Sequence, residues 1–325
     1  MIRYWGKIRK VRCKPEVMNP EHELMIIGCG PAAITAAIYA ARKRIDVQMV
    51  SEDIGGQVAT TFGIENYPGF RYITGPELVE KLVEQMNQLD IEQQIGEKIT
   101  KLSRVDGSYV AVTGSGKEFS AQSALIATGA YPRELGVPGE EKYRGKGVSY
   151  CATCDAPLFA DATVAVVGGG NSALSAAFEL SRIARKVYLI SRRQWRADEA
   201  PLIEGVKAST NIEPIIGYVV EQIAGEEVVK GVTVKPREGN GGRRSLTVDG
   251  IFVEIGLRPN TSFAEGLVAI NDFGEIIVDC DTFTGVPGLF AAGDVTNVKD
   301  KQIVIAAGQG ALAAMGVFEY LLKRR

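Results

Sequence analysis

Two cysteines, Cys151 and Cys154, are separated by two small residues and followed directly by Asp155. Cysteines with this spacing can close a small disulfide ring, so the pair can store and release two electrons. The reactive form is the thiolate, and a Cys-x-x-Cys setting commonly lowers a thiol pKa. The single histidine, His22, is distant in the sequence. Asp155 is therefore the best local candidate for a general acid.

Two other interpretations of the cysteine pair are half of a zinc site and two incidental buried residues. Zinc takes about four ligands. The remaining cysteines, Cys13, Cys29 and Cys280, are scattered along the chain. The sequence contains no second ligand pair, so no metal site is expected.

Composition narrows the class of protein. A chain of 325 residues with 46% apolar and 23% charged residues indicates a globular protein of two domains. The net charge of −2 gives no reason to expect nucleic acid or an anionic membrane as a partner. No apolar run is expected to span a membrane. Scattered cysteines favour a reducing cytosol, so a cytoplasmic location is expected.

Residues 1–23 differ from the rest because six of the first 14 are basic. They include no apolar stretch or cleavage site of a secretory signal. We expect an N-terminal extension that is solvated, packed at an edge of the fold, or a docking tail for an acidic partner.

A dinucleotide-binding unit is predicted at the start of the chain. The apolar run Leu24 to Ile27 predicts a buried parallel strand, and a helical pattern covers Ile34 to Arg42 before a second strand, Asp46 to Val50. The glycines between strand and helix let the backbone approach a pyrophosphate at the helix N-terminus. A carboxylate after the second strand suits a free ribose diol. The candidate residues are Gly28, Gly30, Pro31, Ala32, Ala33 and Glu52.

The same unit recurs 140 residues later, with Gly28 matching Gly168 and Gly30 matching Gly170. The two copies differ where the ribose would be bound, because Arg192 stands at the position equivalent to Glu52. A guanidinium makes bidentate hydrogen bonds to a 2′-phosphate, so the second site is predicted to prefer NADPH. The alternative is a solvated basic helix start. The candidate residues are Gly168, Gly170, Asn171, Ser172, Ala173, Arg192, Arg193 and Arg196.

Two nucleotide sites and one dithiol predict a short electron path. A nicotinamide does not easily reduce a disulfide directly, whereas a flavin can accept a hydride and pass electrons on. The first site is therefore the FAD candidate. The final helix, Gln302 to Leu322, is rich in alanine and glycine on its first turns, which favours close packing against a flat cofactor or a neighbour, or else ordinary packing on a sheet.

The sequence resembles the low-molecular-weight thioredoxin reductases from Leu24 to Leu322. The motifs that carry the resemblance, in this order, are Gly28 to Ala33, Gly55-Gly56-Gln57, Glu65 to Gly69, Ala127-Thr128-Gly129, Cys151 to Asp155, Gly168 to Ala173, Arg192-Arg193-x-x-Arg196, and Gly293-Asp294-Val295 with Lys301-Gln302.

The resemblance implies an α/β fold of two Rossmann-like domains of the three-layer ββα type. An FAD domain in two segments, 24–130 and 260–325, would enclose an NADPH domain, 131–259, that carries the dithiol. It implies a homodimer and a hinge near Gly129–Pro132 and Gly256–Asn260, which turns the dithiol between flavin and solvent. It gives Asp155 the role of general acid. Further cofactor residues that it implies are, for FAD, Gly56, Gln57, Asn66, Thr128, Gly129, Gly293, Asp294, Lys301, Gln302 and Ile303, and, for NADPH, Ile255 and Gly256.

The implied activity is transfer of electrons from NADPH through FAD and the dithiol to the disulfide of thioredoxin or a similar small redoxin. Ser191 and Lys301 depart from the histidine and arginine usual in that family. Residues Tyr143 to Pro157 and the segment from Phe290 onward also resemble the flavoprotein component of alkyl hydroperoxide reductase. The alternatives are therefore a reductase of a glutaredoxin-like or peroxiredoxin-linked partner that uses NADH, and a non-enzymatic flavin redox sensor.

Overall fold

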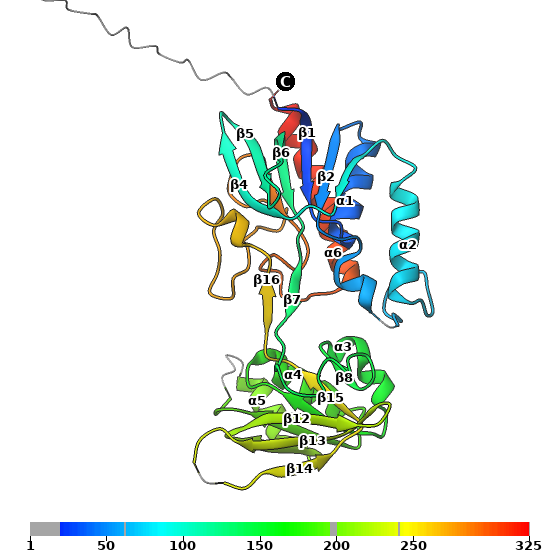
Figure 1. The fold of residues 1–325 in the computed structure, drawn as a ribbon, viewed down its shortest axis with the longest axis vertical. Helices are drawn as coiled ribbons and strands as arrows, with labels where there is room; N and C mark the ends of the chain where they lie inside the picture. The colour runs from blue at the N-terminus through cyan, green and yellow to red at the C-terminus, as the bar shows by residue number, and fades with distance from the viewer. Residues whose placement is uncertain (1–19, 62, 196–199, 240, 325) are drawn as a thin grey trace, which may run out of the picture.

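The computed structural model describes residues 20–61, 63–195, 200–239 and 241–324. They form two α/β bodies arranged along the long axis of the molecule and joined by two crossings of the chain (Figure 1). Most of the expected N-terminal extension, residues 1–19, lies outside the described residues. The first strand begins at His22, two residues earlier than predicted, because His22 already pairs with Ala121 of the neighbouring strand.

The first body is built on a seven-stranded sheet in the order β3-β2-β1-β6-β5-β4, with β17 also beside β6. Strands β3, β2, β1, β6 and β17 run parallel, and β4 and β5 form an antiparallel hairpin against β6. The strands are β1 (His22–Ile27), β2 (Val47–Ser51), β3 (Glu92–Ile95), β4 (Ile99–Val105), β5 (Ser108–Thr113), β6 (Glu118–Ile126) and β17 (Leu289–Ala291).

Helices cover one face of this sheet, and the loops after the second crossing cover the other. Side chains in β1 alternate accordingly: Leu24 and Ile26 join the core beneath the helices, whereas Met25 and Ile27 join the opposite core. At Gly310, an added Cβ would lie 2.1 Å from the carbonyl oxygen of Ala32, so α6 packs tightly on α1. The helical segments are α1 (Pro31–Arg42), η1 (Gly56–Thr60), α2 (Gly75–Met86), η3 (Ser262–Ala264) and α6 (Ile303–Leu322).

The second body has a five-stranded parallel sheet in the order β11-β10-β9-β15-β8. Helices lie on one face and a separate three-stranded antiparallel sheet lies on the other, which gives three layers. The elements are β8 (Val148–Ser149), α3 (Ala152–Asp155), η2 (Ala156–Phe159), β9 (Thr163–Val167), α4 (Asn171–Ser181), β10 (Lys186–Ser191), α5 (Ala200–Ala208), β11 (Ile212–Ile216), β12 (Tyr218–Gly225), β13 (Val229–Pro236), β14 (Arg244–Thr247) and β15 (Gly250–Val253).

The sequence repeat is a structural repeat. In the first body Ile27 pairs with Val50, and in the second Val167 pairs with Ile190, so both pairs keep the shift of 140 residues. The amide of Gly28 donates to Val50, and that of Gly168 donates to Ile190. The predicted α/β fold with two Rossmann-like units is therefore confirmed.

Two short strands connect the bodies, β7 (Ala130–Pro132) and β16 (Leu257–Pro259), and they pair with each other antiparallel (Figure 1). Two hydrogen bonds between Thr128 and Asn260 hold the two strands together at the end of this ribbon next to the first body. Thr128 Oγ1 donates to the carbonyl of Asn260 at 2.7 Å, and Asn260 Nδ2 donates to the carbonyl of Thr128 at 2.8 Å. The ribbon coincides with the predicted hinge positions. The domain boundaries at 130 and 259 stay predictions.

Helix α6 contradicts the prediction that no apolar segment is long enough to span a membrane. It has 20 residues, and a stretch of 18 of them has a mean hydropathy of 1.4, so by length and composition it could cross a membrane. The prediction was wrong because this helix combines large apolar residues with many alanines and glycines, which together keep the segment apolar over 20 residues. One face of α6, including Ala313 and Val317, is buried in the core beside α1, as in the core helix of a globular body.

Candidate active site

Cys151 and Cys154 are joined by a disulfide, with their Cα atoms 5.3 Å apart. Cys151 is the N-cap of the one-turn helix α3, where its Sγ accepts a hydrogen bond from the amide of Cys154 at 3.2 Å. The small side chain of Ala152 is buried between the turn and α4, which lets the turn lie close to the second body. Cys154 is exposed and Cys151 is half-buried. The turn thus presents both sulfurs at the surface of the second body.

Asp155 ends α3 and is half-buried. Burial raises the pKa of its carboxyl above the ordinary value, and a hydrogen bond with Ser149 opposes this effect. The carboxyl therefore keeps its proton to a higher pH than a solvated aspartate does. That property suits a group that donates a proton to a departing thiolate.

A cleft of about 1860 Å³ separates the two bodies and is lined by residues from both. The dithiol turn, the first glycine turn and the start of α4 border it. Nearly all of the predicted FAD residues line it, and Ala33 does not, because it is fully buried in the core. The predicted residues that line the cleft are Gly28, Gly30, Pro31, Ala32, Glu52, Gly56, Gln57, Asn66, Thr128, Gly129, Cys151, Cys154, Asp155, Asn171, Ser172, Gly256, Gly293, Asp294, Lys301, Gln302 and Ile303.

The first glycine turn can accept a bound pyrophosphate. At Gly28 an added Cβ would lie 2.4 Å from the carbonyl oxygen of Ala127, so a larger residue is excluded by the backbone. The space in front of Gly30, at the N-terminus of α1, is open. Glu52 lines the cleft and forms an ion pair with Lys98 at 2.9 Å. These residues fit FAD: an open helix N-terminus for the phosphates and an adjacent carboxylate for the ribose.

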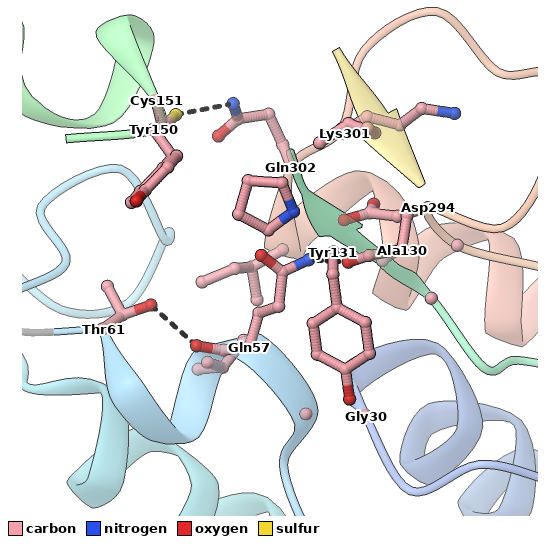
Figure 2. Close-up of a pocket in the computed structure, with 18 of the residues that line it drawn as sticks. Gly30, Gln57, Thr61, Ala130, Tyr131, Tyr150, Cys151, Asp294, Lys301 and Gln302 are labelled. Carbon is pink, nitrogen blue, oxygen red and sulfur yellow. Dashed lines mark hydrogen bonds between the residues drawn. The ribbon is translucent and has the colours of Figure 1, made fainter. Parts of the chain in front are cut away.

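The two bodies are in contact in the cleft where Gln302 of the first body meets Cys151 of the second. Asn66 Nδ2 donates to Gln302 Oε1 at 3.1 Å. The amide nitrogen of Gln302 is left facing Cys151 Sγ at 3.9 Å (Figure 2). Nearby, Gln57 Nε2 donates to the carbonyl of Ala130 in the ribbon. This contact places the disulfide at the cleft wall formed by the N-terminus of α6.

Asp294 and Lys301 lie beside this contact (Figure 2). Burial raises the pKa of Asp294, and the positive charge of Lys301 opposes the shift. Lys301 forms an ion pair with Glu275 at 2.9 Å and is mostly buried. Lys301 therefore supplies a fixed positive charge to this wall of the cleft.

The second glycine turn is equally tight. An added Cβ at Gly168 would lie 2.2 Å from the carbonyl oxygen of Glu254, whereas the space at Gly170 is open. Arg192 and Arg193 are exposed after β10 and lie outside the lining of the cleft. The Oγ of Ser191 donates to the carbonyl of Arg193 at 2.8 Å and so shapes this loop. Gly168, Gly170, Ala173 and Ile255 also lie outside the cleft lining, and Arg196 lies outside the described residues.

Sequence reasoning missed two carboxylates beside the dithiol, Glu179 and Glu254, which both line the cleft. Burial raises the pKa of Glu254 to about 7, with a hydrogen bond from Ala152 opposing and the charge of Glu179 reinforcing the shift. One signal was available: Glu254 is the charged residue in an otherwise apolar strand end, Ile251 to Ile255. Glu179 gives no such signal, because polar residues are common on helix surfaces.

A family model described as pyridine nucleotide-disulphide oxidoreductase matches residues 22–310, and the chain belongs to this family. The chain is 40% identical over 310 residues to a component of the alkyl hydroperoxide reductase of Staphylococcus aureus strain MSSA476, a match that covers 95% of this chain and 61% of that relative. It spans about three fifths of the length of the curated relatives that it matches. Family membership implies a flavin and a pyridine nucleotide.

Solved structures agree with this assignment. Thioredoxin reductase from Streptococcus pyogenes is 38% identical and superposes with a TM-score of 0.87 over 93% of this chain and 98% of that chain. Thioredoxin reductase from Lactococcus lactis in its FR conformation is 35% identical and covers 93% of this chain and 100% of that chain, yet its TM-score is 0.64.

Proposed function

We propose that this chain is an NADPH-dependent, FAD-containing reductase that passes electrons through Cys151 and Cys154 to the disulfide of thioredoxin or a similar small redoxin. One observation carries the proposal: the redox-active turn of the second body opens into the same cleft as the FAD-type glycine turn and touches Gln302 of the first body. The family, and the thioredoxin reductases of similar fold, support this chemistry.

The roles of individual residues follow from their positions. FAD, when bound, would supply the two-electron chemistry that links NADPH to the disulfide. The open N-termini of α1 and α4, at Gly30 and Gly170, bind the two pyrophosphates. Arg192 and Arg193 bind the 2′-phosphate of NADPH. Asp155 donates a proton to the thiolate that leaves when the Cys151–Cys154 disulfide opens.

Rotation of the two bodies about the β7–β16 ribbon is part of the proposal. The dithiol must face the flavin to be reduced and face solvent to reduce a partner. Two structures with nearly equal identity and coverage give TM-scores of 0.87 and 0.64. Such a difference is expected when two rigid bodies keep their folds and change their relative orientation. A two-stranded ribbon is a suitable hinge because few contacts must break.

A homodimer is supported by the outer face of α6. Val304, Leu312, Met315 and Leu322 are large apolar residues that lie between 40% and 51% exposed along this helix. Exposed apolar stripes of this kind commonly bind another protein surface. A Leu312→Glu substitution is expected to shift the protein toward monomer in sedimentation, and an unchanged dimer would exclude this face. The cytoplasmic location stays a prediction.

The second candidate function is delivery of electrons to a peroxiredoxin-linked partner. The specific observation in its favour is the 40% identity to the alkyl hydroperoxide reductase component of Staphylococcus aureus. Because this chain covers 61% of that relative, a separate small redoxin would have to carry the electrons.

Steady-state turnover separates these functions. NADPH and NADH are each supplied to the purified flavoprotein with a thioredoxin, a glutaredoxin-like protein or a peroxiredoxin as acceptor. The proposal expects NADPH and a thioredoxin-type redoxin to give the highest kcat/KM. Preference for a peroxiredoxin-linked acceptor would favour the second function, and reduction of the flavin without turnover on any acceptor would favour a redox sensor.

A further inference from the structure

The two middle residues of the dithiol turn are each held by a carboxylate. The amide of Ala152 donates to Glu254 Oε1 at 3.3 Å, and Thr153 Oγ1 donates to Glu179 Oε2 at 3.2 Å. Glu254 follows β15 directly, and Glu179 lies in α4, so both carboxylates belong to the second body. We refer to Glu179 and Glu254 as the carboxylate pair. The pair fixes the turn against the body that must carry it.

The surroundings of Glu254 disfavour its charge. Burial is the main cause of a pKa of about 7, and the negative charge of Glu179 adds to it. Two other charged groups belong to neighbouring elements. Asp155 lies at the other end of α3, and Arg133 packs beside Gly256 with its Nε donating to the carbonyl of Leu257. The hydrogen bond from Ala152 lowers the pKa of Glu254 but does not cancel the effect of burial.

We propose that Glu254 is a positioning residue that holds the dithiol turn and takes up a proton from solvent when the Cys151–Cys154 disulfide is reduced. This inference rests on the proposed function, because reduction of the disulfide is the step that it serves. The glycine turns and Asp155 give the carboxylate pair no role, whereas its hydrogen bonds to the two residues between the cysteines give it one.

The charge balance gives the reason. Reduction adds two electrons and breaks the S–S bond. With one proton the products are a thiol and a thiolate, so one negative charge appears next to the carboxylate pair. When Glu254 takes up a proton from solvent, it loses its own negative charge, so the net charge beside the turn stays the same and the reactive sulfur remains a thiolate. Once Glu254 ionises, its negative charge opposes formation of the thiolate and raises the thiol pKa.

The test measures the thiols directly and requires neither NADPH nor a protein acceptor. The purified flavoprotein is reduced with dithiothreitol, and alkylation of Cys151 and Cys154 by iodoacetamide is followed by peptide mass spectrometry from pH 6 to pH 9. In Glu254→Gln the two cysteines should react at the wild-type rate at pH 6, where Glu254 is protonated. At pH 8 they should react about threefold to tenfold faster than in wild type, because the opposing carboxylate is gone. Since no turnover is involved, failure here is distinguishable from failure of the proposed function.

Two comparisons guard the result. Exposed Cys280 is an internal control whose profile should not change, and Glu226→Gln removes an exposed carboxylate elsewhere in the second body. Glu179→Gln removes the charge that raises the pKa of Glu254, so the slowing of alkylation by ionised Glu254 should begin at a lower pH than in wild type. Identical profiles for wild type, Glu254→Gln and Glu179→Gln would overturn the inference.

Discussion

The two nucleotide units share one backbone plan and differ in what packs on their helices. In the first, α1 is covered by α6, and Gly310 allows the two helices to touch. In the second, α4 is covered by the dithiol turn through Ala152. The strand pairing and the backbone hydrogen bonds of the glycine turns are the same in both units at a shift of 140 residues. The repeat therefore supplies two equivalent nucleotide-binding units, which we call frames. The units differ in the element that packs on the helix: α6 on α1 in the first, and the dithiol turn on α4 in the second.

The same comparison holds at the ribose positions. Glu52 is balanced by Lys98 at the cleft wall, whereas Arg192 and Arg193 are exposed and available to a phosphate. Under the proposed function, the first unit thus suits a cofactor with a free ribose diol. The second unit suits a cofactor with a 2′-phosphate.

The largest expected effect on turnover comes from removing the dithiol, which only the second unit carries. Cys151→Ser and Cys154→Ser should each lower disulfide reductase turnover by on the order of 10³-fold, because neither variant can form the disulfide. Reduction of the flavin by NADPH should continue at the wild-type rate, since both glycine turns are intact. Stopped-flow absorbance of the flavin, paired with the turnover assay, checks both statements; full turnover in either variant would refute the dithiol mechanism.

A matched pair of glycine substitutions tests whether the two frames have separate cofactors. Gly28→Ala and Gly168→Ala each place a Cβ against a backbone carbonyl, at 2.4 and 2.2 Å. Gly28→Ala should purify with at least about tenfold less flavin, because the turn must shift away from the pyrophosphate. Gly168→Ala should keep its flavin and raise the KM for NADPH by about tenfold or more. Flavin loss in both variants, with circular dichroism showing folded protein, would mean that the frames are not independent.

Much of this comparison could be predicted from the sequence. The glycine spacing, the apolar strands and the 140-residue repeat follow from local rules, so both units and the disulfide were predicted. The structure added contacts between distant segments. Gln302 meets Cys151 across 151 positions, and nothing local to either residue indicates it. The same holds for Glu179 and Thr153, because tertiary packing alone brings them together.

The nicotinamide preference is a smaller effect. Arg192→Ala should raise the KM for NADPH by about tenfold and leave the KM for NADH within about twofold, because the proposed function has the guanidinium bind only the 2′-phosphate. Steady-state kinetics with both nucleotides checks this. The equivalent substitution in the first frame, Glu52→Gln, is the control and should alter neither KM. An equal loss for NADPH and NADH would place Arg192 outside the phosphate site.

The smallest expected effect is on stability. The pKa of Glu254 is raised in the folded chain to about 7 from 4.5, so its contribution is fully favourable below about pH 4.5 and is lost as pH rises through 7. Glu254→Gln should match wild type near pH 4 and be more stable at pH 8 by about 1–2 kcal/mol, allowing for partial exposure. Thermal unfolding at both pH values measures this, and a difference independent of pH would contradict the raised pKa.

The central claim is that electrons from NADPH at the second nucleotide unit reach the Cys151–Cys154 disulfide through FAD at the first unit. The most direct measurement is anaerobic titration of the purified flavoprotein with NADPH, followed by alkylation and mass analysis of the peptide that contains Cys151 and Cys154. We predict that both cysteines become alkylated as NADPH is oxidised, and that protein stripped of FAD leaves them as a disulfide. A disulfide that persists after the flavin is fully reduced would contradict the account.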